Sequence, residues 1–178
     1  MGVNRGHSRE SADAVIAVLS VDTGEWLDIA RGLIIEYGHS IADVAACSLE
    51  HQRFDDELAN LPGRYDPSRG GRLFVAMVDG QPAGCIALRA LPELGPSVCE
   101  MKRMYVRPAY RGQRLGRLLA ERLIDEARAA GYTLMKLDTD TAPKFAAAIG
   151  LYRSLGFVEC ERYNADPDPK TLWFEKRL

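Results

Sequence analysis

Apolar residues along the chain fall into short runs that predict a sheet with helices between its strands. Runs rich in β-branched or aromatic residues and bounded by turn residues are typical of strands. Such runs occupy residues 14–20, 72–78, 83–89, 98–106, 133–139, 157–163 and 171–176. The second and third runs are separated by Asp79-Gly80-Gln81-Pro82, which predicts a hairpin turn.

Four other segments show the three- and four-residue apolar spacing of amphipathic helices. The clearest runs over residues 113–130, where Leu115, Leu119 and Leu123 recur on one face and Gly131 supplies the stop. Residues 144–154 predict a shorter helix, and residues 41–58 predict another before the break at 61–63. Thr23 is the expected N-cap of a first helix through Tyr37. Strands and helices in this order predict an α+β fold with one mixed sheet.

Length and composition favour one globular domain. The 178 residues suffice for one domain with a sizeable core, and the chain is 47% apolar and 27% charged. No run approaches the roughly 18 apolar residues that span a membrane. The opening segment, residues 1–12, lacks the apolar stretch of a secretory signal and is expected to be a frayed tail. These features predict a cytoplasmic location.

The cysteines and histidines predict no metal site. Cys47, Cys85, Cys99 and Cys160 are widely spaced and form no C-x-x-C pair, so neither a zinc pattern nor a dense disulfide framework is indicated. Buried reduced thiols are the simpler interpretation. The three histidines do not cluster either.

Charge is distributed unevenly although the net charge is only −2. Residues 21–60 hold two bases against nine acids, namely Asp22, Glu25, Asp28, Glu36, Asp43, Glu50, Asp55, Asp56 and Glu57. Residues 102–117 reverse the sign with no acid and six bases, namely Lys102, Arg103, Arg107, Arg111, Arg114 and Arg117. The acidic segment would suit a cationic ligand, although an acidic helix face is more often simply solvated. The basic segment would suit an anion.

The basic segment also contains a glycine-bearing turn from strand to helix. A helix start offers unpaired N–H groups and a positive dipole, and Gly112 and Gly116 would let a phosphate approach closely. A turn of this kind can also be architecture alone. Neither a Walker A loop nor the G-x-G-x-x-G fingerprint is present, so neither ATP nor NAD is favoured.

Residues 100–106, Pro108, residues 111–117 and residues 151–157 together resemble the GNAT superfamily of N-acetyltransferases in order and spacing. The resemblance covers residues 72–178. It implies a single domain over residues 1–178, with a mostly antiparallel, twisted sheet of about seven strands and helices on both faces. Residues 72–178 would form the acyl-CoA-binding core, and the acidic helices of residues 21–62 would lie on the acceptor side.

The resemblance also implies where acetyl-CoA, the acyl donor, would bind. The pantetheine arm would follow the end of one strand, and the pyrophosphate would lie over the turn. The implied cofactor-binding residues are Met104, Tyr105, Val106, Arg111, Gly112, Gln113, Arg114, Leu115, Gly116 and Arg117. Arg114 stands where the family's pyrophosphate turn, R/Q-x-x-G-x-G/A, usually has its middle glycine. Ordinary helical dihedrals there would require no glycine, and the guanidinium would either reach a CoA phosphate or point into solvent.

Two catalytic residues follow from the same resemblance. Glu100 matches a general-base position, and Tyr152 matches the tyrosine that lies beside the CoA sulfur. The alternatives are a strand-end carboxylate in an ion pair and an aromatic residue in a helix–sheet contact. Asp138 is a second candidate base. Cys99 has no paired histidine, so direct transfer is preferred over an acyl-enzyme.

These inferences predict an N-acyltransferase that joins an acetyl group to the amine of a small molecule or peptide, without a metal. The alternative is an acyl-CoA sensor that has no turnover. Nucleic-acid binding is disfavoured because the basic segment lacks a recognition motif. A membrane partner is not expected either. The acceptor and the oligomeric state stay open, a homodimer included.

Overall fold

The computed structural model describes residues 14–21, 23–42, 48–165 and 168–178. Its centre is a seven-stranded sheet with the strand order β1-β2-β3-β4-β5-β7-β6. Among the described strands, only β4 and β5 pair in parallel, and every other neighbouring pair is antiparallel. The predicted mixed, mostly antiparallel sheet is therefore confirmed. The strands are β1 (Ile16–Ser20), β2 (Arg72–Val78), β3 (Gln81–Ala90), β4 (Val98–Val106), β5 (Leu134–Asp140), β6 (Val158–Glu159) and β7 (Thr171–Arg177).

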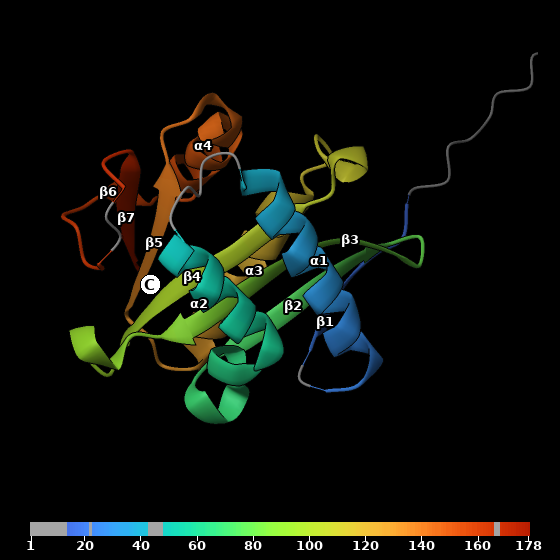
Figure 1. Ribbon diagram of the computed structural model, residues 1–178, viewed down its shortest axis with the longest axis horizontal. Helices are drawn as coiled ribbons and strands as arrows, with labels where there is room; N and C mark the ends of the chain where they lie inside the picture. Colours follow the sequence, from blue (N-terminus) through green and yellow to red (C-terminus); the bar gives the residue numbers. More distant parts are fainter. Residues whose placement is uncertain (1–13, 22, 43–47, 166–167) are drawn as a thin grey trace, which may run out of the picture.

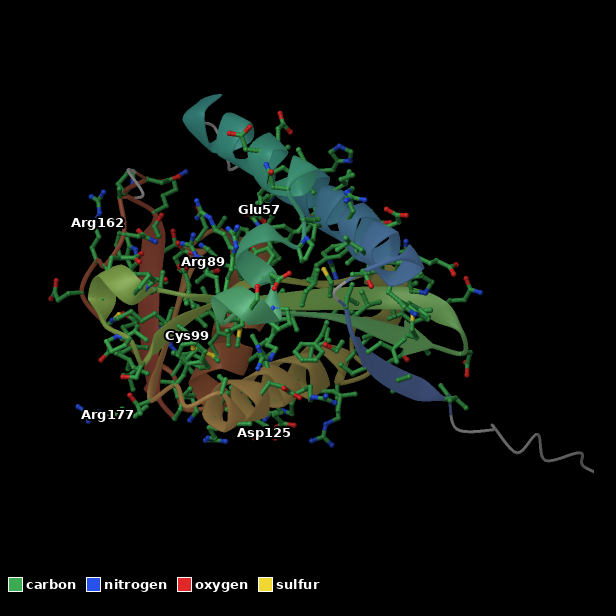
Figure 2. All side chains as sticks on the ribbon, turned by 90° about the horizontal axis from the view of Figure 1, so that it is seen from below. Glu57, Arg89, Cys99, Asp125, Arg162 and Arg177 are labelled. Carbon is green, nitrogen blue, oxygen red and sulfur yellow. The ribbon has the colours of Figure 1, made fainter. Side chains whose placement is uncertain are left out.

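Helices cover both faces of this sheet (Figure 1). The helices are α1 (Glu25–Ile41), α2 (Ser48–Ala59), α3 (Leu115–Ala129) and α4 (Ala146–Ser154). Figure 2 shows α1 and α2 on one side of the strands and α3 on the other. None of the helices in the described part of the chain is long and apolar enough to cross a membrane.

The two faces are built from alternating residues of the same strands. On one face, Leu33 and Ile34 of α1 belong to a buried cluster with Leu73 and Val75 of β2. On the other face, residues of α3 and α4 pack with Phe74 of β2 and other inward-pointing side chains. Because both faces are covered, the central strands read as nearly continuous apolar runs.

Three of the predicted boundaries are wrong. The N-cap of α1 is Gly24 rather than Thr23, and Gly24 has a positive φ of 69°. The second helix was expected over residues 41–58, but α1 extends to Ile41 and α2 begins at Ser48, with residues 43–47 lying outside the described residues. The strand expected over residues 157–163 is only the short β6, because Tyr163 and Asn164 turn inward to hydrogen-bond carboxylates.

One irregularity in β4 positions the candidate site. The β3–β4 register shifts between Cys85 and Ala87, and Arg103, opposite this shift, has a positive φ of 54°. A bulge of this kind bends a strand and increases its twist. On its other side, β4 pairs with β5 only as far as Glu100 opposite Lys136. The two strands then diverge toward α4, as Figure 1 shows.

Candidate functional site

The divergence of β4 from β5 leaves backbone groups inside the sheet without a strand partner. Beyond Glu100, no described residue of β4 pairs with β5, and this unpaired stretch includes the predicted residues Met104, Tyr105 and Val106. Backbone N–H and C=O groups in such a position need hydrogen bonds from another source. An extended ligand could supply them as a short extra strand.

The turn after β4 ends at the start of α3 and supplies a second set of unpaired donors. Arg114 is the N-cap of α3, and no side chain caps the helix. The N–H groups of the first helical turn, from Leu115 to Arg117, therefore point out of the helix without intrahelical partners. A Cβ added at Gly116 would meet Leu151 and Val106 at ordinary contact distance. This arrangement suits an anion.

Arg114 does not have the helical dihedrals under which an arginine would be unstrained there. Its φ is 62° and its ψ is 10°, which is the left-handed conformation. A non-glycine residue in this conformation costs roughly 1–2 kcal/mol. The left-handed conformation explains why a glycine would be favoured at this position. Arginine adopts the same turn here at a cost in stability. Gly112, two residues earlier, also has a positive φ, of 80°.

The other polar side chains of the turn have different roles. Arg111 donates through Nε to the carbonyl oxygen of Val106 at 3.0 Å, and Gln113 donates to the carbonyl oxygen of Ala109. Arg117 joins α3 to α4 through Ser154 Oγ at 2.6 Å. Arg114 makes no ion pair or side-chain hydrogen bond with any described residue. Its guanidinium is therefore available to a ligand.

Tyr152 has a packed ring and an unpaired hydroxyl. The ring lies against Phe157 and Phe174, with centroids 6.0 and 6.3 Å away, and only 7% of the residue is exposed. The hydroxyl has no hydrogen-bond partner among the described residues, and since none of their buried side-chain oxygens lacks a partner, the hydroxyl oxygen must be partly exposed. Burial raises the pKa of Tyr152, and the nearby Tyr37 and Asp138 raise it further. Leu151, the neighbour of Tyr152 in α4, and Val106, in the part of β4 that does not pair with β5, both lie near Gly116, so Tyr152 lies close to this end of β4.

Glu100 lies at the point where β4 and β5 part, and its side chain is completely buried. Arg89 Nε donates to Glu100 Oε2 at 2.5 Å, and Tyr163 Oη donates to Oε1 at 2.7 Å. Lys102 Nζ lies 3.3 Å from the same Oε1. Both carboxylate oxygens are thus hydrogen-bonded, and a proton could reach Glu100 only through a neighbouring hydroxyl or a water.

Asp138 shares the lysine of this network. Lys102 Nζ lies 2.7 Å from Asp138 Oδ1, and Asn164 donates to Oδ2 at 2.6 Å. Burial alone would raise the pKa of Asp138, but the charge of Lys102 outweighs it and lowers the pKa. Burial alone would likewise lower the pKa of Lys102, but Asp138 and Glu100 raise it. The side chain of Asp138 is 17% exposed, so it is the more accessible of the two candidate bases.

Two acids of the acidic helices pair with two arginines of the basic segment. Arg103 makes two hydrogen bonds to Glu57 of α2, at 2.7 and 3.0 Å. Arg107 makes two to Glu36 of α1, at 2.9 and 2.6 Å. Hydrogen bonding to Arg107 lowers the pKa of Glu36. Part of the charge asymmetry in the sequence therefore holds α1 and α2 against β4, and these acids are not available to a cationic ligand.

Cys99 is unsuited to nucleophilic chemistry. It is buried, its Sγ lies 3.7 Å from the carbonyl oxygen of Leu134, and burial raises the pKa of its thiol to about 12. Only the thiolate is a strong nucleophile. This geometry agrees with the preference for direct transfer.

Comparison with known proteins identifies the family. Residues 39–157 match the Acetyltransferase (GNAT) family. The chain belongs to this family. It is 38% identical to an uncharacterised N-acetyltransferase of Schizosaccharomyces pombe over 164 residues, which cover 92% of this chain and 95% of that protein.

Solved structures agree with the family assignment. The fold superposes on a Streptococcus agalactiae acetyltransferase with a TM-score of 0.72 and 25% identity, covering 92% of this chain and 98% of that one. It also superposes on yncA of Salmonella typhimurium, solved with its cofactor acetyl-CoA, with a TM-score of 0.66 and 23% identity over 91% and 93% of the two chains. The GNAT-like sheet is therefore confirmed.

Sequence reasoning missed the partners of Glu100 and Asp138. Arg89, Tyr163 and Asn164 come from β3 and from the segment between β6 and β7, far apart along the chain. The one available signal was Arg89 itself, a charge that follows a buried apolar run in β3. Tyr163 also lines an open hollow of about 850 Å³ together with Lys136 and Glu175. This hollow lies beside the Glu100 network and away from the α3 turn.

Proposed function

We propose that this GNAT protein transfers an acetyl group from acetyl-CoA to a primary amine, directly and through a tetrahedral intermediate. The observation that carries the proposal is the Tyr152 hydroxyl, which has no hydrogen-bond partner among the described residues and lies close to the end of β4 that does not pair with β5. Because no buried side-chain oxygen in the described part of the chain lacks a partner, this hydroxyl must reach the protein surface although its ring is packed, and a ligand there could accept its hydrogen bond.

The donor would be held mainly by backbone. The backbone groups from Met104 to Val106 that have no β5 partner would pair with the pantetheine amides, for which Arg111 would release the Val106 carbonyl oxygen, and the donors from Gly112 to Arg117 would hold the pyrophosphate. Arg111 and Arg114 would add positive charge. The thioester would then lie where the strands part, near Glu100 and Tyr152.

Proton transfer would follow the residues at that point. The amine must lose a proton to attack the thioester carbon, and Glu100 would accept that proton through Tyr163 or a water. Asp138 is the alternative base, and its greater exposure supports it. When the intermediate collapses, the C–S bond breaks, and Tyr152 would donate a hydrogen bond or a proton to the departing thiolate.

The test is a thiol-release assay with acetyl-CoA and a panel of amines, followed by mass spectrometry of the product. Amine-dependent release of free CoA with an N-acetyl product supports the proposal. An acyl-CoA sensor would bind acetyl-CoA in calorimetry but release no thiol with any amine. A product acetylated on oxygen instead of nitrogen would contradict the choice of acceptor.

A further inference from the structure

Arg89 has a guanidinium edge that its ion pair leaves unused. Its Nε donates to Glu100, while neither Nη1 nor Nη2 donates to any described residue. The side chain is 20% exposed, and no buried side-chain nitrogen in the described part of the chain lacks a partner, so this edge is open to a ligand. Figure 2 shows Arg89 on the same side of the sheet as Glu57, opposite Asp125 of α3.

The position of this edge relates it to the acceptor rather than to CoA. Arg89 is directly opposite Glu100 in the β3–β4 ladder, and Glu100 is the last residue of β4 that pairs with β5. Under the proposed function the amine gives its proton to Glu100, and Arg89 contacts Glu100 directly, so the open edge of Arg89 lies on the acceptor's side of the site.

The chemistry of the edge selects a carboxylate. A guanidinium presents a planar pair of donors that matches the two oxygens of a carboxylate. Arg89 and Lys102 are balanced by Glu100 and Asp138, so the network has little net charge. A zwitterion would keep this balance of charge. A polycation would bring uncompensated positive charge beside the cationic side chains of Arg89 and Lys102.

We infer that Arg89 binds the carboxylate of the acceptor, and that the acceptor is a small zwitterionic amine of the free amino-acid type. The inference rests on the proposed function for its account of the amine, but carboxylate binding by Arg89 can be tested without turnover. A decarboxylated amine or an amino-acid amide would lose the contact. A charge-assisted bidentate pair of this kind is expected to favour the acid by about 10- to 100-fold.

The experiment compares free L-amino acids with their amides and their decarboxylated amines. In the transfer assay, the acid should have a 10- to 100-fold higher kcat/KM than its amide. The amide has the less basic amine, so deprotonation alone would favour the amide. Arg89→Lys keeps the charge beside Glu100 but removes the planar donor pair, so this preference should fall about tenfold. A purely structural role would lower the activity on both substrates equally.

Controls separate this inference from the proposed function. Arg128→Gln, on α3 across the sheet, should leave the preference unchanged, and thermal unfolding would verify that each variant folds. Calorimetry with the CoA-saturated protein measures amino-acid binding without turnover. Arg89-dependent amino-acid binding without thiol release would remove the transferase proposal but keep the carboxylate site. Equal use of acids and amides, or a preference unaffected by Arg89→Lys, would overturn the inference while the transferase proposal stands.

Discussion

The turn that begins α3 and the sheet face beneath α2 are both rich in charge, but they use it differently. The turn offers backbone N–H groups, and Arg114 within it has no partner among the described residues. On the sheet face, Arg89, Lys102 and Arg103 are each paired with a carboxylate. Backbone donors can hold any pyrophosphate, whereas paired side chains fix a particular geometry. The comparison suggests that the turn binds the common donor and the face selects the acceptor.

The largest effect is expected from Gly116→Glu in the turn. The new carboxylate would lie among the first-turn N–H groups and repel a phosphate, so CoA binding should be lost in calorimetry. The fold should persist, because a Cβ at this glycine meets only Leu151 and Val106 at 3.6 and 3.8 Å. Gly32→Glu on α1 is the matched control, since a Cβ there meets nothing within 4 Å. If folded Gly116→Glu protein kept its CoA affinity, the pyrophosphate would not bind at this turn.

Glu100→Gln is expected to have the next largest effect. General-base catalysis contributes about 10²- to 10⁴-fold, so kcat/KM should fall by about 10³-fold and its acidic limb against pH should flatten. Because the change also disturbs Arg89 and Lys102, the shape of the pH profile is the deciding measurement. Asp138→Asn should be measured beside it. An unchanged profile in Glu100→Gln and a flattened one in Asp138→Asn would assign the base to Asp138.

Lys102→Met tests how much the ion pairs on this sheet face contribute to the stability of the protein. Removing this lysine leaves Glu100 and Asp138 without their shared cation, and breaking a buried pair costs about 3–5 kcal/mol. We expect a loss at the lower end of this range, because the side chains of Lys102 and Asp138 are 21% and 17% exposed. The pKa of Asp138 is lowered in the fold, so its contribution is present at neutral pH and is lost as the pH falls below its ordinary value of about 3.9.

Urea unfolding at neutral and acid pH measures this loss, with Lys170→Met on the surface as the control. The difference between Lys102→Met and the parent should be largest near neutral pH and should shrink at acid pH. The raised pKa of Lys102 also means that the parent keeps the pair until the pH rises above the ordinary lysine value of about 10.4. A difference that grows at acid pH would contradict the assigned charges.

Tyr152→Phe should lower kcat by about 10²-fold, or about 2.7 kcal/mol, with little change in KM for acetyl-CoA. The ring contacts with Phe157 and Phe174 stay, so the hydroxyl is the only difference. Ordinary tyrosine and thiol pKa values make full proton transfer uphill by about 2 kcal/mol, and burial raises the pKa of Tyr152 further. We therefore expect a hydrogen bond that strengthens as sulfur gains charge. Near-parental kcat under rate-limiting chemistry would return Tyr152 to a packing role.

The contrast between the turn before α3 and the sheet face beneath α2 also explains how much of each could be predicted from the sequence. The turn is local, so Gly112, Gly116 and the apolar spacing after Leu115 predict both the helix and its anion site within one stretch of chain. The sheet face is not local. The partners of Glu100 come from β3 and from the segment after β6, and no spacing relates them. The cross-pairing of Glu57 with Arg103 was equally hidden, because a charge run does not show which charges it will meet.

The smallest effect is expected from Arg114→Gly, which also decides between the two roles of this arginine. Glycine relieves about 1–2 kcal/mol of left-handed strain but loses roughly 0.5–1 kcal/mol through the freedom of the unfolded chain, so the free energy of unfolding should rise by about 0.5–1 kcal/mol. Gly112→Ala is the reverse control and should destabilise, because a Cβ there has open space but a φ of 80°. If the guanidinium holds a CoA phosphate, Arg114→Gly should also weaken CoA binding by about tenfold, more at low salt than at high salt. Unchanged affinity at every salt concentration would mean that Arg114 points into solvent and that the backbone donors of α3 suffice for the pyrophosphate.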